Sequence, residues 1–347
     1  MARFLPVFDR SPCRGPWLIL TTHTSQFPRH RSQTTKEACH IYTDGDQDAV
    51  SAVRATLRRR KAAIIAGATG SAVDDRDAID AMFRSDPDPD VAVEARMVGG
   101  VPAYWLAAGA ADPSRVVLYL HGGSYAAGGL ATHRDITGRL SRAGICRVLL
   151  LLYRLAPEHP FPAPVEDALA AYRALLLSGV DPARLVLVGD SAGGGLALAL
   201  LMALRDAHEP LPAGAVVMSP WTDLASTAPS LRTKADIDPW LVAESVPREA
   251  AVYLAGADPR DPLASPLYGD LSGLPPLLVH VGEDEILLDD AVRVAEEARR
   301  AGVLTTLKVW PGMWHVFQLF AGQIADARIA LDEIGRFIKA MTPDVRP

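Results

Sequence analysis

From about residue 94 onward, short apolar runs alternate with longer segments of helical periodicity. Continuously apolar runs separated by helices are typical of a parallel sheet that is covered on both faces. A hairpin around Gly99 and Gly100 adds two antiparallel strands, so the pattern predicts an α/β fold with a mostly parallel eight-stranded sheet. The other strands are predicted in VVLYL, CRVLLLLY, LVLVG, AVVMS, LLVHV and TTLKVW, and helices near residues 131–143, 164–178, 192–206, 289–301 and 323–340.

Three segments depart from this alternation. Residues 1–45 carry scattered arginines among Ser, Thr, His and Pro without periodicity, which indicates a flexible or non-native extension. Residues 46–90 begin with an amphipathic helix, and residues 224–262 place short helical segments where a strand would be expected. We therefore expect N-terminal cap helices over 46–90 and a core domain over 91–347 that carries a cap insertion.

The composition and net charge of the chain indicate which kinds of molecule it is expected to bind. The chain has 347 residues, of which 49% are hydrophobic, and 35 basic residues against 41 acidic ones give a net charge of -6. An acidic balance does not favour nucleic acid or an anionic membrane surface, and no apolar run approaches the roughly 20 residues that span a bilayer. Three cysteines do not indicate a disulfide framework. The composition predicts a cytoplasmic protein with a small-molecule substrate, no nucleic-acid partner and no membrane association.

The motif GDSAG lies directly between the strand LVLVG and a helical run. A serine at a tight strand-to-helix turn is presented at the carboxyl edge of the sheet, and the small residues around it let the backbone approach closely. A glycine-rich turn without catalysis would be the alternative, but the strand and helix on either side favour Ser191 as a nucleophile.

The segment HGGSY follows the strand VVLYL, at the place where a loop of oxyanion donors is required. We expect backbone N–H groups of Gly122, Gly123 and Ser124, together with that of Ala192, to stabilise a developing oxyanion. His121 is expected to organise this loop.

The partners of a serine nucleophile in this fold follow later in the chain, first an acid and then a histidine. His315 follows the last predicted strand and is the expected general base. The acid is less defined by spacing, because Glu283, Asp284 and Glu285 are adjacent, and Asp289 and Asp290 follow. No pair of His or Cys residues has metal-ligand spacing, so no metal and no cofactor is expected.

Together these residues resemble the bacterial hormone-sensitive-lipase-like esterases of the α/β-hydrolase fold, in the branch with a GDSAG elbow. The resemblance runs from about residue 50 to the C-terminus. It includes HGGSY, YRLAPEHPFPA, GDSAGG, SPWTDL, GEDEILLDD and MWHVF, although many relatives have a third glycine where this chain has Ser124. It implies a triad of Ser191, Asp284 and His315, a helical cap, and a homodimer, because relatives often dimerise through the last strand and helix.

The expected function is hydrolysis of short- to medium-chain acyl esters through an acyl-enzyme. The resemblance extends to ε-lactone hydrolases and acetyl-ester hydrolases, which use the same chemistry. A non-catalytic binder is a third reading, because plant gibberellin receptors resemble this family without its catalytic histidine. Side chains expected to line the substrate pocket, with cap-to-core packing as the alternative, are Tyr125, Trp221, Trp240, Leu241 and Phe317.

Overall fold

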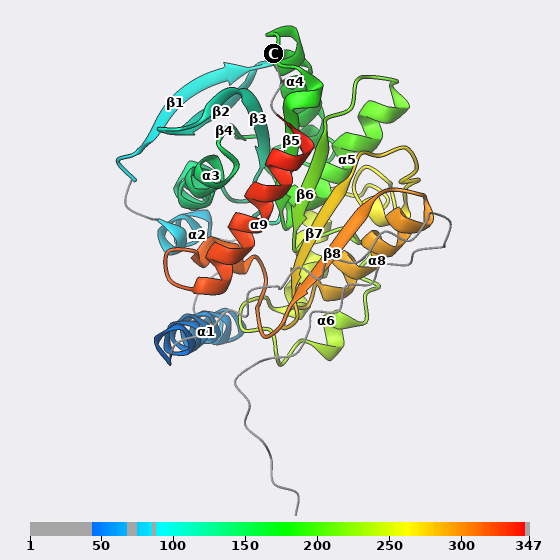
Figure 1. Cartoon of the computed structure of the whole chain (residues 1–347). Coiled ribbons are helices and arrows are strands. Elements are labelled where there is room, and N and C mark those ends of the chain that lie inside the picture. Colours follow the sequence, from blue (N-terminus) through cyan, green and yellow to red (C-terminus); the bar gives the residue numbers. More distant parts are fainter. Residues whose placement is uncertain (1–43, 68–74, 85–87, 344–347) are drawn as a thin grey trace, which may run out of the picture.

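The computed structural model describes residues 44–67, 75–84 and 88–343 and contains one eight-stranded sheet (Figure 1). The strand order is β1-β2-β4-β3-β5-β6-β7-β8, with β2 antiparallel to both of its neighbours and every later pair parallel. This confirms the predicted mostly parallel sheet. The strands are β1 (Val91–Val98), β2 (Val101–Ala108), β3 (Asp112–Leu120), β4 (Cys146–Leu151), β5 (Leu185–Asp190), β6 (Gly214–Met218), β7 (Leu277–Gly282) and β8 (Thr305–Trp310).

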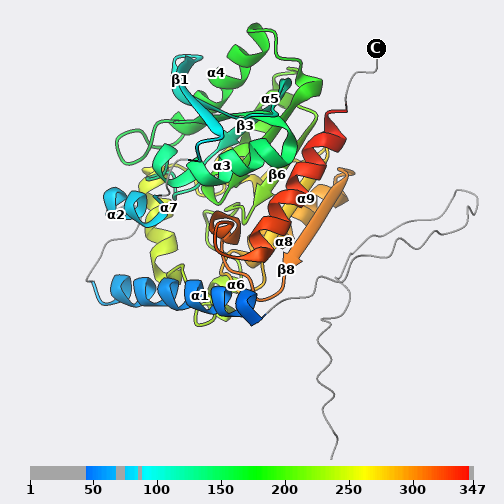
Figure 2. The same ribbon diagram turned by 60° about the vertical axis from the view of Figure 1, so that its left-hand side comes forward.

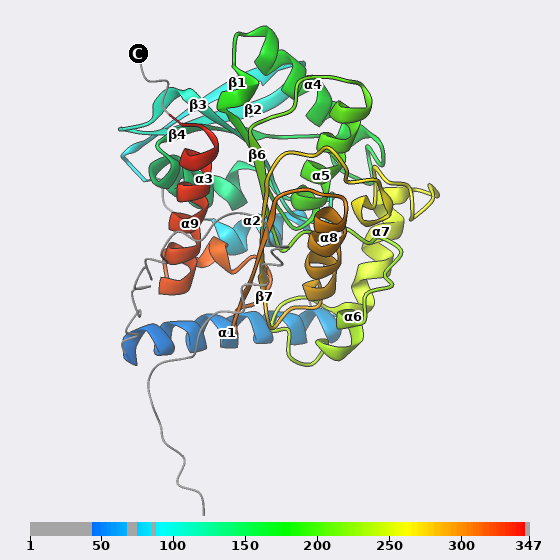
Figure 3. The same cartoon turned by 45° about the vertical axis from the view of Figure 1, so that its right-hand side comes forward.

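Helices cover both faces of the sheet. Helices α3 and α9 pack against each other on one face, whereas α4, α5 and α8 lie on the other (Figures 1 and 3). The α-helices are α1 (Asp44–Ile65), α2 (Arg76–Phe83), α3 (Leu130–Gly144), α4 (Ala163–Leu177), α5 (Ala192–Asp206), α6 (Ser230–Thr233), α7 (Val246–Leu254), α8 (Leu288–Arg300) and α9 (Ala325–Met341). Single 3₁₀ turns lie at Pro182–Arg184, Ala243–Ser245, Pro266–Tyr268 and Phe317–Phe320.

The alternation of side chains along the central strands divides the core in two. Leu118 and Leu187 belong to the cluster that faces α4, α5 and α8, whereas Val117 and Val186 belong to the cluster that faces α3 and α9. Successive side chains of a strand point to opposite faces, so a strand that is covered on both sides must be apolar throughout. This explains why the central strands read as unbroken apolar runs.

Helix α1 lies across the edge of the sheet where the parallel strands end (Figure 2). Its Arg54 forms an ion pair with Asp284 after β7 and donates to the carbonyl of Gly312 after β8. Its Lys61 donates to the carbonyls of Ala235 and Asp238, at 2.6 and 2.8 Å. The helix thus connects the loops at this edge to the segment that follows α6.

Segments 46–90 and 224–262 both contain helices near this edge, and we refer to the two together as the cap segments. Residues 1–43, where almost all of the predicted extension falls, lie outside the described residues. Among the helices that the structure describes, none combines the length and the apolar character that crossing a membrane requires.

Candidate active site

Ser191 occupies a strained turn between β5 and α5. Its backbone has φ 52° and ψ −123°, a conformation that L-residues rarely adopt. The turn is held by the Ser191 amide, which donates to the carbonyl of Met218 at 2.8 Å. Gly193 has no room for a side chain, because a Cβ atom there would lie 2.0 Å from the carbonyl oxygen of Leu120. The predicted strand-to-helix elbow is therefore present.

His315 lies on the loop after β8 and contacts a carboxylate from the loop after β7. Its Nδ1 lies 3.1 Å from Oε1 of Glu285, and both side chains are buried. The second oxygen of Glu285 accepts hydrogen bonds of 2.8 Å from the Gly282 amide and from the hydroxyl of Ser219. Two hydrogen bonds to Oε2 thus fix the carboxylate of Glu285, while its Oε1 contacts the imidazole of His315.

The choice of Asp284 as the carboxylate that orients His315 is wrong. Its carboxylate points to the cap, where Oδ2 lies 2.9 Å from Nη2 of Arg54. Its amide donates to the carbonyl of Met313 at 2.8 Å, which fixes the backbone so that the next residue, Glu285, faces His315. The reason is geometric, since neighbouring residues on a tight loop direct their side chains differently.

Burial disfavours the charged form of His315, but the hydrogen bond and the negative charge of Glu285 outweigh it, with further contributions from Asp238 and Asp190. The pKa of His315 is therefore raised above its ordinary value. Such a histidine can hold a proton during a reaction and release it afterwards.

The loop after β3 brings two unused backbone donors, those of Gly123 and Ser124, to the amide of Ala192 at the start of α5, but Gly122 is not one of them. The Gly122 amide donates to Oδ1 of Asp190 at 3.0 Å, which corrects its expected place in the oxyanion hole. In residues 44–67, 75–84 and 88–343, no acceptor is recorded for the amides of Gly123, Ser124 and Ala192. Positive φ values of 118° at Gly123 and 54° at Ser124 turn this loop sharply.

Asp190, which precedes the serine, connects the elbow to the donor loop. Besides the Gly122 amide, its Oδ1 accepts from the hydroxyl of Tyr119 at 2.8 Å and lies 3.2 Å from Nε2 of His133. Burial opposes ionisation of Asp190, but the charge and hydrogen bond of His133 and the hydroxyl of Tyr119 hold its pKa below the ordinary value. The second residue of the GDSAG motif thus anchors the loop.

The segment YRLAPEHPFPA supports the loops around the site through two sets of contacts. The hydroxyl of Tyr153 donates to the carbonyl of His121 at 2.5 Å, and the two rings stack at 4.3 Å. Glu158 forms an ion pair with Arg76 of α2, and Arg76 also donates to the carbonyl of Ala156 at 2.5 Å. One motif therefore supports both the donor loop and a cap helix.

Ser191 and His315 line one cavity of about 100 Å³. Of the five side chains expected in the pocket, Trp240 and Leu241 line this cavity, and the Trp240 ring contacts His315 edge-on at 5.6 Å. The others belong to the core. Tyr125 stacks on Tyr253 at 3.7 Å, Phe317 packs against Trp310, and Trp221 packs 6.3 Å from the Tyr125 ring. All three are buried and lie outside the cavity lining.

Most of the cavity-lining residues that the cap segments contribute were not predicted from the sequence. Helices α1 and α2 and the segment around α7 contribute Arg60, Ile64, Ile79, Phe83, Val242, Ser245 and Glu249. The usable signal was the stripe of apolar residues on α1, in which Arg60 interrupts the series Val53, Leu57 and Ile64.

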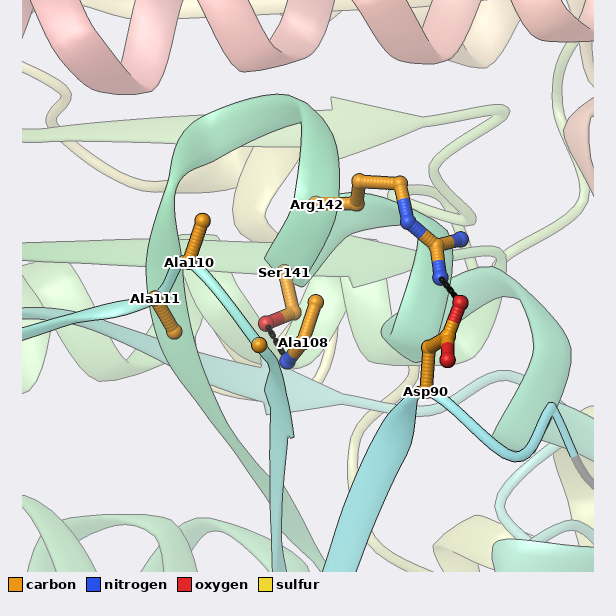
Figure 4. A pocket seen from close by; sticks show the side chains of 7 residues that line it. Asp90, Ala108, Ala110, Ala111, Ser141 and Arg142 are labelled. Carbon is orange, nitrogen blue, oxygen red and sulfur yellow. Dashed lines mark hydrogen bonds and ion pairs between the residues drawn. The ribbon is translucent and has the colours of Figure 1, made fainter.

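A second, larger hollow of about 380 Å³ lies beside Asp90, Ala108 and Arg142 (Figure 4). It lies near the end of β2 and the start of β3, at the opposite edge of the sheet from Ser191. Among the described residues that line it, the one hydroxyl is that of Ser141, which donates to the carbonyl of Cys146 and accepts from the amide of Ala108. That serine is occupied by structural hydrogen bonds, so the smaller cavity is the candidate active site.

Comparisons with known proteins establish the family of the chain. Residues 117–319 match a family model described as alpha/beta hydrolase fold. The chain is 49% identical over 245 residues to an acetyl-hydrolase of Streptomyces hygroscopicus, covering 71% of this chain and 82% of that protein. A crystal structure of an esterase from the bacterial hormone-sensitive lipase family is 48% identical, with a TM-score of 0.82 over 85% of this chain and 98% of that one.

A structure of the esterase EstE5 soaked with p-nitrophenyl butyrate is 41% identical, with a TM-score of 0.81 over 85% of this chain and 99% of that one. The similar proteins thus include an acetyl-hydrolase and an esterase, and the match covers most of the length of each protein. The chain belongs to the bacterial hormone-sensitive-lipase family of α/β-hydrolases and is a carboxylic ester hydrolase.

Proposed function

We propose that this enzyme hydrolyses short- to medium-chain acyl esters through an acyl-enzyme formed on Ser191. One observation carries the proposal: Ser191, on its strained elbow, lines the same cavity as His315, whose Nδ1 is held by the buried Glu285. A serine hydroxyl is a weak nucleophile until a neighbouring base removes its proton, and this arrangement supplies the base and its orienting acid.

In the first half of the reaction, Oγ of Ser191 attacks the ester carbonyl and its proton passes to Nε2 of His315. The Nδ1 hydrogen bond to Glu285 keeps the other nitrogen unprotonated beforehand and stabilises the imidazolium afterwards. His315 then gives the proton to the departing alcohol. In the second half, a water molecule attacks the acyl-enzyme and its proton passes to His315. His315 then returns a proton to Oγ of Ser191 as the carboxylic acid leaves, which restores the serine.

The oxyanion of each tetrahedral intermediate would be stabilised by the amides of Gly123, Ser124 and Ala192. These amides have no recorded acceptor in the described part of the chain, and Ala192 is the first residue of α5, where the helix dipole favours negative charge. The replacement of a third glycine by Ser124 is compatible with this role, because any non-proline residue has a backbone N–H group.

The size of the cavity supports small acyl groups. Its volume of about 100 Å³ is well below the roughly 300 to 1,000 Å³ of pockets that hold drug-sized ligands. The 49% identity to an acetyl-hydrolase of Streptomyces hygroscopicus also supports a short acyl group for this enzyme. We expect kcat/KM to be highest for acyl chains of two to about six carbons.

The mechanism is tested with Ser191→Ala. The variant is expected to fold normally, to lose nearly all turnover of p-nitrophenyl butyrate, and to escape labelling by a fluorophosphonate probe that labels the wild type. Substantial turnover by the variant would refute the nucleophile. Failure of the wild type to react with the probe would instead favour a binder without an activated serine.

Substrate size is tested with p-nitrophenyl esters of two to sixteen carbons, beside ε-caprolactone as a cyclic ester. We expect a maximum at short chains and a steep fall beyond about eight carbons. A maximum at twelve carbons or more would contradict the proposed size range, and a higher kcat/KM for the lactone would reassign the substrate class.

A further inference from the structure

Arg60 is a cation on the apolar face of a cap helix. Val53 and Leu57 of α1 are buried, and Ile64, on the same face, lines the active-site cavity. Arg60 follows Leu57 by three residues and precedes Ile64 by four, so it lies on that face and lines the cavity together with Ser191. A hydrophobic residue would be the ordinary choice at this position.

The guanidinium of Arg60 lacks partners within the described residues. Its Nε and Nη2 atoms are buried, and neither has a hydrogen-bond partner in that part of the chain. Asp75 influences Arg60 electrostatically, but the Asp75 carboxylate accepts the amide of Ala78 at 2.9 Å as the N-cap of α2. No ion pair joins Arg60 to any described carboxylate.

Two carboxylates, those of Asp190 and Glu249, line the cavity with Arg60, and both already accept hydrogen bonds, Asp190 from the Gly122 amide and the hydroxyl of Tyr119. Glu249 of α7 accepts from Oγ of Ser124 at 2.6 Å and from Oγ of Ser245 at 3.1 Å. Burial lowers the pKa of Arg60, an effect that Asp75 partly offsets, so the cavity wall bears an incompletely compensated cation.

Buried polar groups in folded proteins nearly always have partners, and an unpaired buried charge is expensive. Because Arg60 lines the cavity that contains the nucleophile, a group of the substrate can supply the missing partner of its guanidinium. A carboxylate both neutralises the guanidinium and fits its planar fork with two parallel hydrogen bonds.

We propose that Arg60 binds a carboxylate carried by the substrate, so that the enzyme favours esters with a carboxylate a few bonds from the ester group over neutral esters of the same length. This inference rests on the proposed ester hydrolysis in the Ser191 cavity and specifies its substrate class. Arg60 is a specificity residue here and takes no part in bond breaking.

The experiment compares two matched pairs of alkyl esters. Monoethyl succinate and ethyl butyrate differ by a terminal carboxylate on the acyl side, whereas 3-acetoxypropionate and propyl acetate differ in the same way on the alcohol side. The readout is the ratio of kcat/KM for the charged ester to that for its neutral counterpart. In Arg60→Met this ratio should fall about 10- to 100-fold in one of the two pairs, which also identifies the side of the ester that faces Arg60.

The matched control is Arg58→Met, which removes an exposed arginine from the same helix and should leave both ratios unchanged. Arg60→Lys keeps the charge but loses the planar fork, so an intermediate ratio is expected. If Arg60→Met does not yield folded protein, Arg60→Gln provides the same comparison.

Unchanged ratios in Arg60→Met for both pairs, with neutral esters still hydrolysed, would overturn the inference and leave the proposed function intact. An equal fall in Arg58→Met would also overturn it, because the effect would then be one of net charge. A wild-type enzyme that hydrolyses none of the four esters would refute the proposed short-ester function and this inference with it.

Discussion

Oε1 of Glu285 lies 3.1 Å from Nδ1 of His315, while the adjacent Asp284 pairs with Arg54 on the cap helix α1. Two neighbouring carboxylates thus have separate tasks, one at the imidazole and one at the contact between the core and α1.

Glu285→Gln should lower kcat for p-nitrophenyl butyrate by about 10³- to 10⁴-fold, because a neutral amide can hold His315 in the wrong tautomer and does not stabilise the imidazolium. Asp284→Asn should cost less than about tenfold, since it weakens only a partly exposed ion pair. Steady-state kinetics of the two variants checks both values. A larger loss in Asp284→Asn than in Glu285→Gln would return the catalytic role to Asp284.

The pH dependence of kcat/KM should report His315. The reaction requires the neutral imidazole. Although burial lowers the pKa of His315, Glu285 outweighs this effect, so the acidic limb of the profile should lie above the ordinary histidine value of about 6.5. Activity should therefore rise as pH increases through this raised pKa. The residual activity of Glu285→Gln should have its limb at lower pH, and a limb that does not move would contradict the assignment.

Tyr153→Phe removes the hydroxyl that donates to the carbonyl of His121 at 2.5 Å, behind the donor loop. We expect kcat to fall about tenfold with little change in KM, because the amides of this loop act mainly in the transition state. The free energy of unfolding should fall by about 1 to 2 kcal/mol.

Tyr172→Phe is the matched control for this change. Tyr172 lies on α4, away from the cavity, and its hydroxyl donates to the carbonyl of Pro210 at 2.8 Å. It should cost similar stability in a urea titration and leave kcat unchanged. Equal losses of kcat in both variants would mean that Tyr153 acts through stability alone.

Gly193→Ala should prevent folding or lower the melting temperature strongly, since the new Cβ would lie 2.0 Å from a backbone oxygen of β3 that cannot move aside. Gly109→Ala provides the comparison, because no atom lies within 4 Å of a Cβ at that turn, and its free energy of unfolding should change by less than about 0.5 kcal/mol. Thermal unfolding of both variants checks this, and a wild-type melting temperature in Gly193→Ala would show that the elbow can relax.

Local signals in the sequence were sufficient for the fold and for two of the proposed catalytic side chains. The periods of strands and helices are properties of neighbouring residues, so the expected helix at 192–206 and hairpin around Gly99 and Gly100 agree with α5 and with β1 and β2. Ser191 was found because it lies directly after a recognisable strand, and His315 because it lies on the loop that follows the last strand. The carboxyl ends of parallel strands share one edge, which brings such residues together.

Choices between adjacent residues needed the tertiary structure. Asp284 and Glu285 differ by one position, as do Gly122 and Gly123, and which of each pair faces the site depends on hydrogen bonds to Met313 and Asp190 from distant segments. Which aromatic residues of the expected pocket face the cavity also depends on contacts between distant segments. Tyr125, Trp221 and Phe317 are buried in the core, whereas Trp240 contacts His315.

The sequence by itself determined the order of strands and helices along the chain and the proposed nucleophile and base, because these depend on periodicity and on position after a strand. Only the tertiary structure decided the orienting carboxylate, the available oxyanion donors and the unpaired cation of Arg60. The physical reason is that the direction of a side chain and the satisfaction of its hydrogen bonds depend on contacts between segments far apart in the chain, such as Arg54 with Asp284, which no local pattern encodes.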